Sequence, residues 1–246
     1  MLQVCLNGAR TPDECAHVPT TPDELAAAAV DAVRAGAEDI HLHPKNADGA
    51  DTMAPRHVEA ALTAVRAAVP GVPVGVTTGA WTAPSAEQRV ADIRAWTVLP
   101  GHASVNWHED GAASVADALV AKGIGIEAGI FTGTDALDRF LGWPQAHRTL
   151  RVLAEVTDTD PRTAPQAAVG LLEALNAATD LPILLHGEDA AAWDILAMAA
   201  SRRLDTRVGL EDVLYLPDGS PASSNAVLIR AARLILEHTR SDKDVR

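Results

Sequence analysis

The feature that most constrains the fold is a regular alternation of short apolar runs with longer, alanine-rich helical stretches. Eight runs have the length and composition of buried strands, and each is followed by a helical stretch. The expected strands are 2–6, 39–43, 73–77, 102–106, 124–128, 150–156, 182–186 and 206–208. The expected helices are 22–35, 55–68, 85–96, 111–122, 134–141, 164–177, 189–202 and 223–238. Eight such units in 246 residues predict an α/β fold, a single (β/α)8 TIM barrel.

Local signals support this division of the chain. Thr21, Pro22 and Glu24 form a typical helix start, and Gly36 ends the same helix. The first strand lacks the Gly-x-Gly-x-x-Gly turn of dinucleotide-binding sheets, which favours the barrel over an open doubly wound sheet. We therefore expect one catalytic domain over residues 1–240 and a charged, frayed tail over 241–246.

Composition excludes several classes of protein. The net charge of −13 works against attraction to phosphate, so we expect no nucleic-acid partner. No apolar run reaches the length of a membrane span, and the N-terminus lacks the pattern of a signal peptide. Cys5 and Cys15 fit neither a zinc finger nor a disulfide framework. These features predict a cytoplasmic protein with reduced thiols.

Catalytic residues of such barrels lie at the carboxyl ends of the strands. In this sequence nearly every expected strand end carries polar residues. They are Asn7, His41, His43, Thr77, Thr78, Gly79, Ser104, Asn106, Glu127, Glu155, His186, Glu188 and Arg207. The sequence therefore predicts a polar site at this end of the barrel.

The second strand provides the clearest metal-binding pattern. His41 and His43 are two residues apart, so their side chains share one face of the strand. Imidazole is a common zinc ligand, and catalytic zinc takes three protein ligands and leaves one position open. Two partly buried histidines bonded to nearby carbonyls would be the structural alternative.

The segment after the last strand offers further candidates. Glu211 could be a third metal ligand, and Asp212 could be a general base kept ionised by Arg207. A solvated acidic turn beside a surface arginine is the alternative. Glu127 is a carboxylate within an apolar strand, which predicts either a function or an ion pair with a neighbouring strand.

The third and fourth strands supply neutral polar groups. Thr77 and Thr78 before Gly79 offer hydroxyl and backbone N–H groups to an oxygen-rich ligand, or they serve only the turn. Ser104 and Asn106 share one strand face, where they could bind substrate or stabilise the barrel interior. We assign these five residues to substrate binding.

Several of these motifs recur in a known family. They are Leu6-Asn7-Gly8-Ala9, Pro19 to Glu24, Ala35-Gly36-Ala37 before His41-Leu42-His43-Pro44, Thr77-Thr78-Gly79, Gly123 to Glu127, and Arg207-Val208-Gly209-Leu210-Glu211-Asp212. In this order and separation, the sequence resembles the β-keto acid cleavage enzymes, named after the 3-keto-5-aminohexanoate cleavage enzyme of lysine fermentation. The resemblance extends over most of the chain.

The resemblance implies a specific chemistry. Members of the family are TIM barrels that hold one zinc or similar divalent ion, and the resemblance implies that His41, His43 and Glu211 hold it in this sequence. They convert a β-keto acid and acetyl-CoA to acetoacetate and a new acyl-CoA. The resemblance makes Asp212 the base and Arg207 its partner. The remaining matching positions are Thr77, Glu127 and either Ser104 or Asn106. It also implies a homo-oligomer such as a tetramer.

The sequence departs from the family pattern in two respects. Lys45-Asn46 stands where family members often have Arg-Asp, and the chain is shorter between the third and fifth strands. Two other functions are compatible with the pattern. One is a metal-dependent aldolase or hydrolase of a keto acid that uses no CoA. The other is a non-catalytic ligand-binding barrel, which the complete set of candidate residues disfavours.

Overall fold

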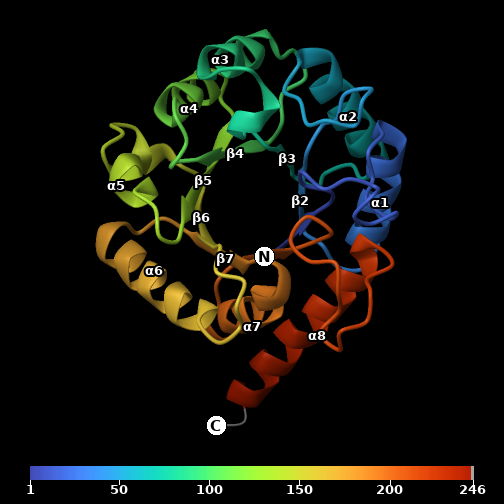
Figure 1. Ribbon diagram of the computed structural model, residues 1–246, viewed down its shortest axis with the longest axis vertical. Helices are drawn as coiled ribbons and strands as arrows, with labels where there is room; N and C mark the ends of the chain where they lie inside the picture. The colour runs from blue at the N-terminus through green and yellow to red at the C-terminus, as the bar shows by residue number, and fades with distance from the viewer. Residues whose placement is uncertain (245–246) are drawn as a thin grey trace.

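Eight parallel strands form one sheet that curls into a barrel, and eight α-helices surround it (Figure 1). The computed structural model describes residues 1–244, with side chains described through Thr239. Neighbouring strands follow the order β7-β6-β5-β4-β3-β2-β1-β8. The sheet is nearly closed, so the architecture is the (β/α)8 TIM barrel that the alternation predicts.

The observed elements lie close to the expected ones. The strands are β1 (Leu2–Cys5), β2 (Asp39–Leu42), β3 (Val74–Val76), β4 (His102–Asn106), β5 (Gly125–Phe131), β6 (Arg151–Val156), β7 (Ile183–Gly187) and β8 (Thr206–Val208). The helices are α1 (Pro22–Arg34), α2 (Pro55–Ala68), α3 (Ala86–Ala95), α4 (Ala112–Ala121), α5 (Ala136–Leu141), α6 (Ala164–Ala178), α7 (Ala192–Arg202) and α8 (Asn225–Asp244). Short 3-10 helices η1 (Ala80–Thr82), η2 (Ala146–Arg148) and η3 (Asp189–Ala191) precede α3, β6 and α7. The expected tail over 241–246 overlaps the end of α8, and residues 245–246 lie outside the described part of the chain.

Strands β7 and β8 close the barrel. Leu184 and Asp205 form an isolated parallel bridge, and the Leu185 N–H donates to the Asp205 carbonyl at 2.9 Å. The hydroxyl of Thr206 donates to the Leu185 carbonyl at 2.8 Å. These bonds satisfy backbone groups that an open sheet edge would expose.

The first helix shows how local sequence sets the boundaries. The Thr21 side chain accepts from the Glu24 N–H, and the Glu24 side chain accepts from the Thr21 N–H, which completes a capping box. Leu25, Ala29 and Ala32 then face the core at helical spacing. The predicted helix start is therefore confirmed in detail.

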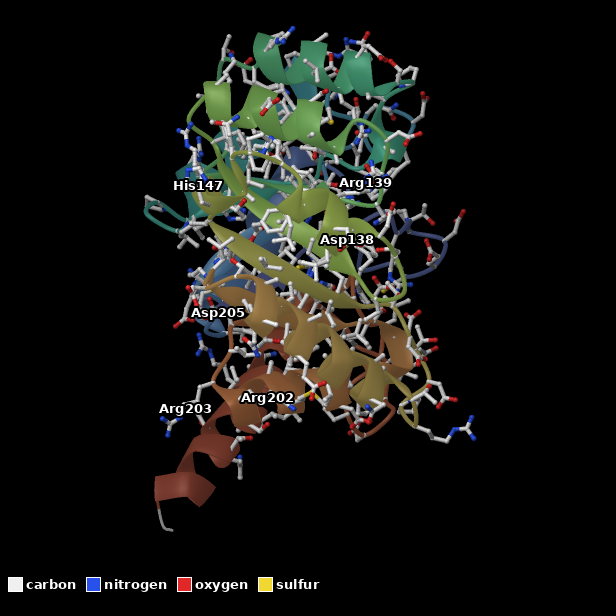
Figure 2. The ribbon with its side chains drawn as sticks, turned by 90° about the vertical axis from the view of Figure 1, so that its left-hand side faces the viewer. Asp138, Arg139, His147, Arg202, Arg203 and Asp205 are labelled. Atoms are coloured by element: carbon white, nitrogen blue, oxygen red, sulfur yellow. The ribbon has the colours of Figure 1, made fainter. Side chains whose placement is uncertain are left out.

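A side view separates the two ends of the barrel (Figure 2). His147 and Asp205 lie just before β6 and β8, at the end where the strands begin. Arg139 lies towards the opposite end, where its guanidinium donates to the carbonyl of His108 at 2.8 Å. No helix within residues 1–244 is long and apolar enough to cross a membrane.

Alternate residues of each strand point into the barrel, and many of them are polar. On β2 the inward residues run from Asp39 at the start to His41 near the end, with His43 following the strand. Strand β5 continues to Phe131, beyond the expected end at residue 128. This extension places an aromatic ring at the carboxyl end of the barrel.

Candidate metal centre and active site

Three potential ligand atoms meet at the carboxyl end of the barrel. His41 lies on the inner face of β2, His43 directly follows that strand, and Glu211 reaches both from the turn after β8. The Glu211 Oε2 atom lies 3.9 Å from His41 Nε2 and 3.7 Å from His43 Nε2. One ligand atom from each of the three residues lies within 4.8 Å of the others. The two histidines and the glutamate named from the sequence are therefore brought together.

The chemistry of this donor set fits a divalent metal such as zinc. Two imidazole nitrogens and one carboxylate oxygen are typical of a catalytic zinc site. Glu211 Oε2 is buried and has no hydrogen-bond partner among the described residues. A buried polar atom without a partner is costly, and a metal ion would supply the missing interaction.

The protonation states suit the same role. Burial raises the pKa of Glu211, but Arg207 and the two histidines lower it more, to about 2. Burial lowers the pKa of His41 to about 4, although Glu211 opposes this shift. The carboxylate is therefore ionised and the imidazole neutral near pH 7, which are the forms that bind metal.

A second group of potential ligands lies beneath the first. Cys5, Glu211 and Asp212 also have atoms within 4.8 Å of one another. Burial raises the pKa of the Cys5 thiol well above its ordinary value, so this thiol stays protonated. Because thiolate rather than thiol binds metal, this group is the weaker candidate.

The turn after β8 brings Arg207 beside both acidic residues. Gly209 is needed there, because a Cβ at this position would lie 1.9 Å from the Cys5 carbonyl oxygen. The Asp212 N–H donates to the Gly209 carbonyl at 3.0 Å and completes the turn. Arg207 Nη2 lies 3.0 Å from Glu211 Oε1 and 3.0 Å from Asp212 Oδ1.

Asp212 has an unusual environment for a carboxylate. It is 1% exposed, and its Oδ2 atom has no hydrogen-bond partner among the described residues. Burial raises its pKa, Arg207 lowers it, and the nearby Glu211 carboxylate raises it, so that the net shift is upward. His186 Nδ1 lies 3.6 Å from Asp212 Oδ1 on the other side. A raised pKa is typical of a carboxylate that exchanges protons.

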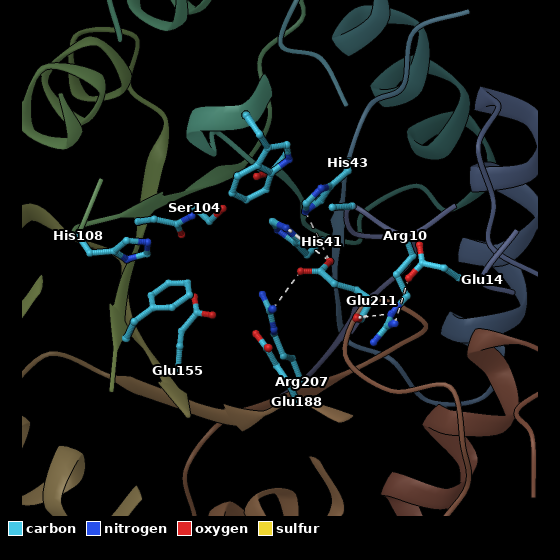
Figure 3. A pocket seen from close by; sticks show the side chains of 15 residues that line it. Arg10, Glu14, His41, His43, Ser104, His108, Glu155, Glu188, Arg207 and Glu211 are labelled. Atoms are coloured by element: carbon cyan, nitrogen blue, oxygen red, sulfur yellow. Dashed lines mark hydrogen bonds and ion pairs between the residues drawn. The ribbon is translucent and has the colours of Figure 1, made fainter. Parts of the chain in front are cut away.

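A cavity of about 330 Å³ is lined by His41, His43, Arg207 and Glu211 (Figure 3). The candidate metal ligands lie on one side of it, and Ser104 and His108 lie on the opposite side. Thr77 and Asn106 also line the cavity, so both strand-four candidates, Ser104 and Asn106, face it. This volume is in the range of small-molecule sites.

Four other predicted residues, Thr78, Gly79, Glu127 and Asp212, do not line the cavity. The Thr78 hydroxyl donates to the Ser104 carbonyl at 2.6 Å, and the Gly79 N–H donates to the Thr77 hydroxyl. Glu127 is fully buried deeper in the barrel, where Arg151 Nε donates to its Oε1 at 2.7 Å. The Oε2 atom of Glu127 lies 4.0 Å from His41 Nδ1, on the side of the ring opposite the Nε2 atom that faces Glu211.

Sequence reasoning missed several residues of the site, including Arg10 and Glu14, which line the cavity. Trp81, His108 and Phe131 line the cavity, although none of them was placed at the site. Asp51 was also missed, and it contacts His43 from the loop after β2. Phe131 was missed because it lies beyond the expected end of β5. Trp81 lies in η1, and the remaining missed residues lie in loops whose paths no motif specified.

The family comparison agrees with this geometry. The model of the beta-keto acid cleavage enzyme family matches residues 1–242, which is nearly the whole chain. The chain belongs to the β-keto acid cleavage enzyme family. A comparison with curated protein sequences finds no match.

Solved structures with the same fold include members of two groups. The apo structure of ObcA has a TM-score of 0.74 and 17% identity, covering 90% of this chain and 62% of ObcA. The binary complex of ObcA with oxaloacetate has a TM-score of 0.72 and 18% identity, covering 90% of this chain and 64% of that chain. A type I 3-dehydroquinate dehydratase from Clostridium difficile has a TM-score of 0.65 and 12% identity, covering 96% and 92% of the two chains. Membership of the β-keto acid cleavage enzyme family rests on the family model, whereas the structural matches show only the fold. The chain spans less than two thirds of the length of ObcA.

Proposed function

We propose that this protein is a zinc-dependent β-keto acid cleavage enzyme. It takes a β-keto acid and acetyl-CoA and releases acetoacetate and a new acyl-CoA. The observation that carries the proposal is the convergence of His41, His43 and Glu211 beside the Arg207–Asp212 pair. Family membership over residues 1–242 supports the same reaction class.

His41, His43 and Glu211 would hold the metal, and zinc suits two nitrogen ligands and one oxygen ligand. When bound, the ion would polarise the keto group and neutralise charge that develops on its oxygen. The cavity beside these ligands has room for a small keto acid. The hydroxyl of Ser104 and the amide of Asn106, on the opposite wall, would orient the substrate.

Asp212 is the proposed general base. Its burial and its raised pKa equip it to accept a proton, while Arg207 fixes the position of its carboxylate. Arg207 also bonds Glu211, so one guanidinium links the base to a metal ligand. Glu127 supports this constellation from the barrel interior, behind His41.

The second substrate follows from the balance of the reaction. Cleavage breaks the bond between the keto carbon and the methylene carbon of the carboxymethyl group, and the keto carbon leaves as part of an acyl group. Transfer to the CoA thiolate conserves the thioester, and the carboxymethyl fragment joins the acetyl group to give acetoacetate. The solved complexes of ObcA with a C4-CoA adduct and oxalate and with oxaloacetate support a CoA compound and a keto acid as the ligand classes. We also propose one domain over residues 1–240, a homo-oligomer and a cytoplasmic location.

The decisive experiment compares reactions with and without acetyl-CoA. Zinc-loaded protein is incubated with a panel of β-keto acids, and both products are measured by mass spectrometry. Equal amounts of acetoacetate and acyl-CoA are expected, with little free acid. Cleavage that needs no acetyl-CoA would instead identify an aldolase or hydrolase, and no turnover by zinc-loaded protein would favour a ligand-binding barrel.

A further inference from the structure

The loop after β2 folds back onto a candidate metal ligand. Lys45 and Asp51 form an antiparallel bridge, and the Asn46 side chain accepts from two N–H groups of the intervening turn. Gly49, with φ of +79°, allows this tight turn. The turn returns the carboxylate of Asp51 to within 2.8 Å of His43 Nδ1.

Asp51 is held from three directions. His43 Nδ1 and Trp81 Nε1 each lie 2.8 Å from its Oδ2 atom, and Lys45 Nζ lies 2.7 Å from Oδ1. Its side chain is only 3% exposed. Because a carboxylate only accepts, His43 must carry its proton on Nδ1, which leaves Nε2 free towards Glu211.

Lys45 is buried as completely as Asp51, with 1% of its side chain exposed. Besides Asp51, its Nζ donates to the carbonyls of Gly8 at 2.8 Å and Arg10 at 3.2 Å. All three ammonium protons therefore have acceptors. These bonds tie the loop after β2 to the loop after β1.

The loop after β1 in turn packs against another candidate ligand. A Cβ on Gly8 would lie 2.4 Å from the Glu211 Cγ, and Gly8 has φ of +57°. Arg10 Nε also donates to the Glu211 carbonyl at 3.0 Å. Through Gly8 and Arg10, Lys45 acts on the position of Glu211 as well as on Asp51.

We propose that Asp51 and Lys45 are positioning residues of the metal centre. Asp51 fixes the tautomer and ring orientation of His43, and Lys45 holds Asp51 and the loop that packs on Glu211. This inference rests on the proposed function, because it assumes that His43 and Glu211 bind a metal. The inference also gives a role to Lys45, which stands with Asn46 where members of the family often have Arg-Asp.

The contrast with His41 sharpens the assignment. His41 Nδ1 has no hydrogen-bond partner among the described residues, and Glu127 lies 4.0 Å away. Only His43 has a carboxylate at hydrogen-bond distance from Nδ1 within this ligand set. A carboxylate behind a ligating histidine fixes its tautomer, and removal of such a partner typically weakens metal affinity roughly 10- to 100-fold.

The first test measures zinc affinity by competition with a chromogenic chelator. Asp51→Asn keeps the shape and one acceptor oxygen, so we expect roughly tenfold weaker binding, whereas Asp51→Ala should approach 100-fold. Lys45→Met should weaken binding about as much as Asp51→Asn. Asp48→Asn changes an exposed carboxylate in the same turn and should bind zinc like the wild type. Circular dichroism checks that each variant is folded.

The second test reads the tautomer in metal-free protein. Long-range ¹H–¹⁵N spectra, with His43 assigned from the His43→Ala variant, should show the Nδ1–H tautomer in the wild type and a mixture in Asp51→Ala. Unchanged zinc affinity and an unchanged tautomer in folded Asp51→Ala would overturn the inference. A wild type that binds no zinc would refute the proposed metal centre, and the tautomer would still decide whether Asp51 orients His43.

Discussion

Two clusters of charged side chains occupy the barrel interior, and they differ in how completely their members are paired. The lower cluster lies near the strand starts and consists of Gln3, Asp39, His102, Glu127 and Arg151. The upper cluster lies at the carboxyl ends and consists of His41, His43, Arg207, Glu211 and Asp212. Both are buried apart from Glu211, whose side chain is 16% exposed, and β2 with the residue that follows it contributes to both because inward positions recur every second residue.

Each carboxylate of the lower cluster forms close ion pairs with other members of the cluster. Arg151 donates to Asp39 at 2.6 Å and to Glu127 at 2.7 Å, and Gln3 donates to both carboxylates. His102 Nε2 lies 2.9 Å from Asp39 Oδ1, and His102 Nδ1 lies 3.1 Å from Glu127 Oε2, an ion pair without a hydrogen bond between these two atoms. Gly75 makes room for this ring, because a Cβ there would lie 2.0 Å from it. Every carboxylate oxygen of this network lies within 3.2 Å of a nitrogen atom from another member.

In the upper cluster, two carboxylate oxygens have no hydrogen-bond donor in the described part of the chain. Glu211 Oε2 and Asp212 Oδ2 are buried and lack hydrogen-bond partners within the described residues, and Glu211 lines the cavity. The comparison teaches that burial of charge does not by itself indicate function. Close ion pairs away from the cavity indicate a structural role, whereas converging groups beside a cavity that lack such close partners indicate a binding site.

The largest effect should come from removing the upper ligands. The double variant His41→Ala, His43→Ala is expected to retain no stoichiometric zinc, because one carboxylate is left of three ligands. Elemental analysis of the zinc-loaded, dialysed protein measures this, and circular dichroism should show a folded barrel. His17→Ala, at an exposed position, is the matched control. Stoichiometric zinc in the double variant would refute the assignment.

Next in size is the effect of breaking the lower cluster. Arg151→Met leaves the Asp39 and Glu127 carboxylates buried without their cation, so the free energy of unfolding should fall by about 3–5 kcal/mol. Urea unfolding measures the change. Arg162→Met removes an exposed arginine paired with Asp160 and should change stability little. If Arg151→Met leaves stability unchanged, the lower cluster is not the support described above.

A smaller effect is expected from Asp212→Asn in the upper cluster. This change keeps the shape but removes the proton-accepting charge, so turnover should fall by roughly two orders of magnitude or more. Zinc content and unfolding should stay close to the wild type. Turnover is followed as acetoacetate formation. Near-normal turnover would mean that another group, such as Glu127, accepts the proton.

The smallest effect is expected from a change of pH that removes the proton of His102. Burial lowers the pKa of His102, but Glu127 and Asp39 more than offset this and raise it to about 10. The pKa exceeds the unfolded value of about 6.5, so the stabilisation is complete below that pH and is lost as pH rises through about 10. Urea unfolding of wild type and His102→Gln at several pH values tests this. The stability difference between them should shrink towards about pH 10, and a constant difference would contradict the charged state of His102.

Sequence patterning determined the barrel and the central ligands. Apolar runs and helix starts fixed the eight βα units, and the spacing of His41 and His43 placed both on one strand face. Glu211, Asp212 and Arg207 could be named because they follow the last strand within one short segment. These inferences succeed because they depend on local geometry, which repeats along the chain.

Only the tertiary structure decided which polar residues face the cavity and which face one another. Glu127 belongs to a paired network because Arg151 and His102 approach it from neighbouring strands. Asp51 reaches His43 because a turn reverses the loop, and Trp81 arrives from a different loop. Contacts of this kind join residues far apart in sequence, and they depend on loop paths and side-chain packing that no local periodicity encodes.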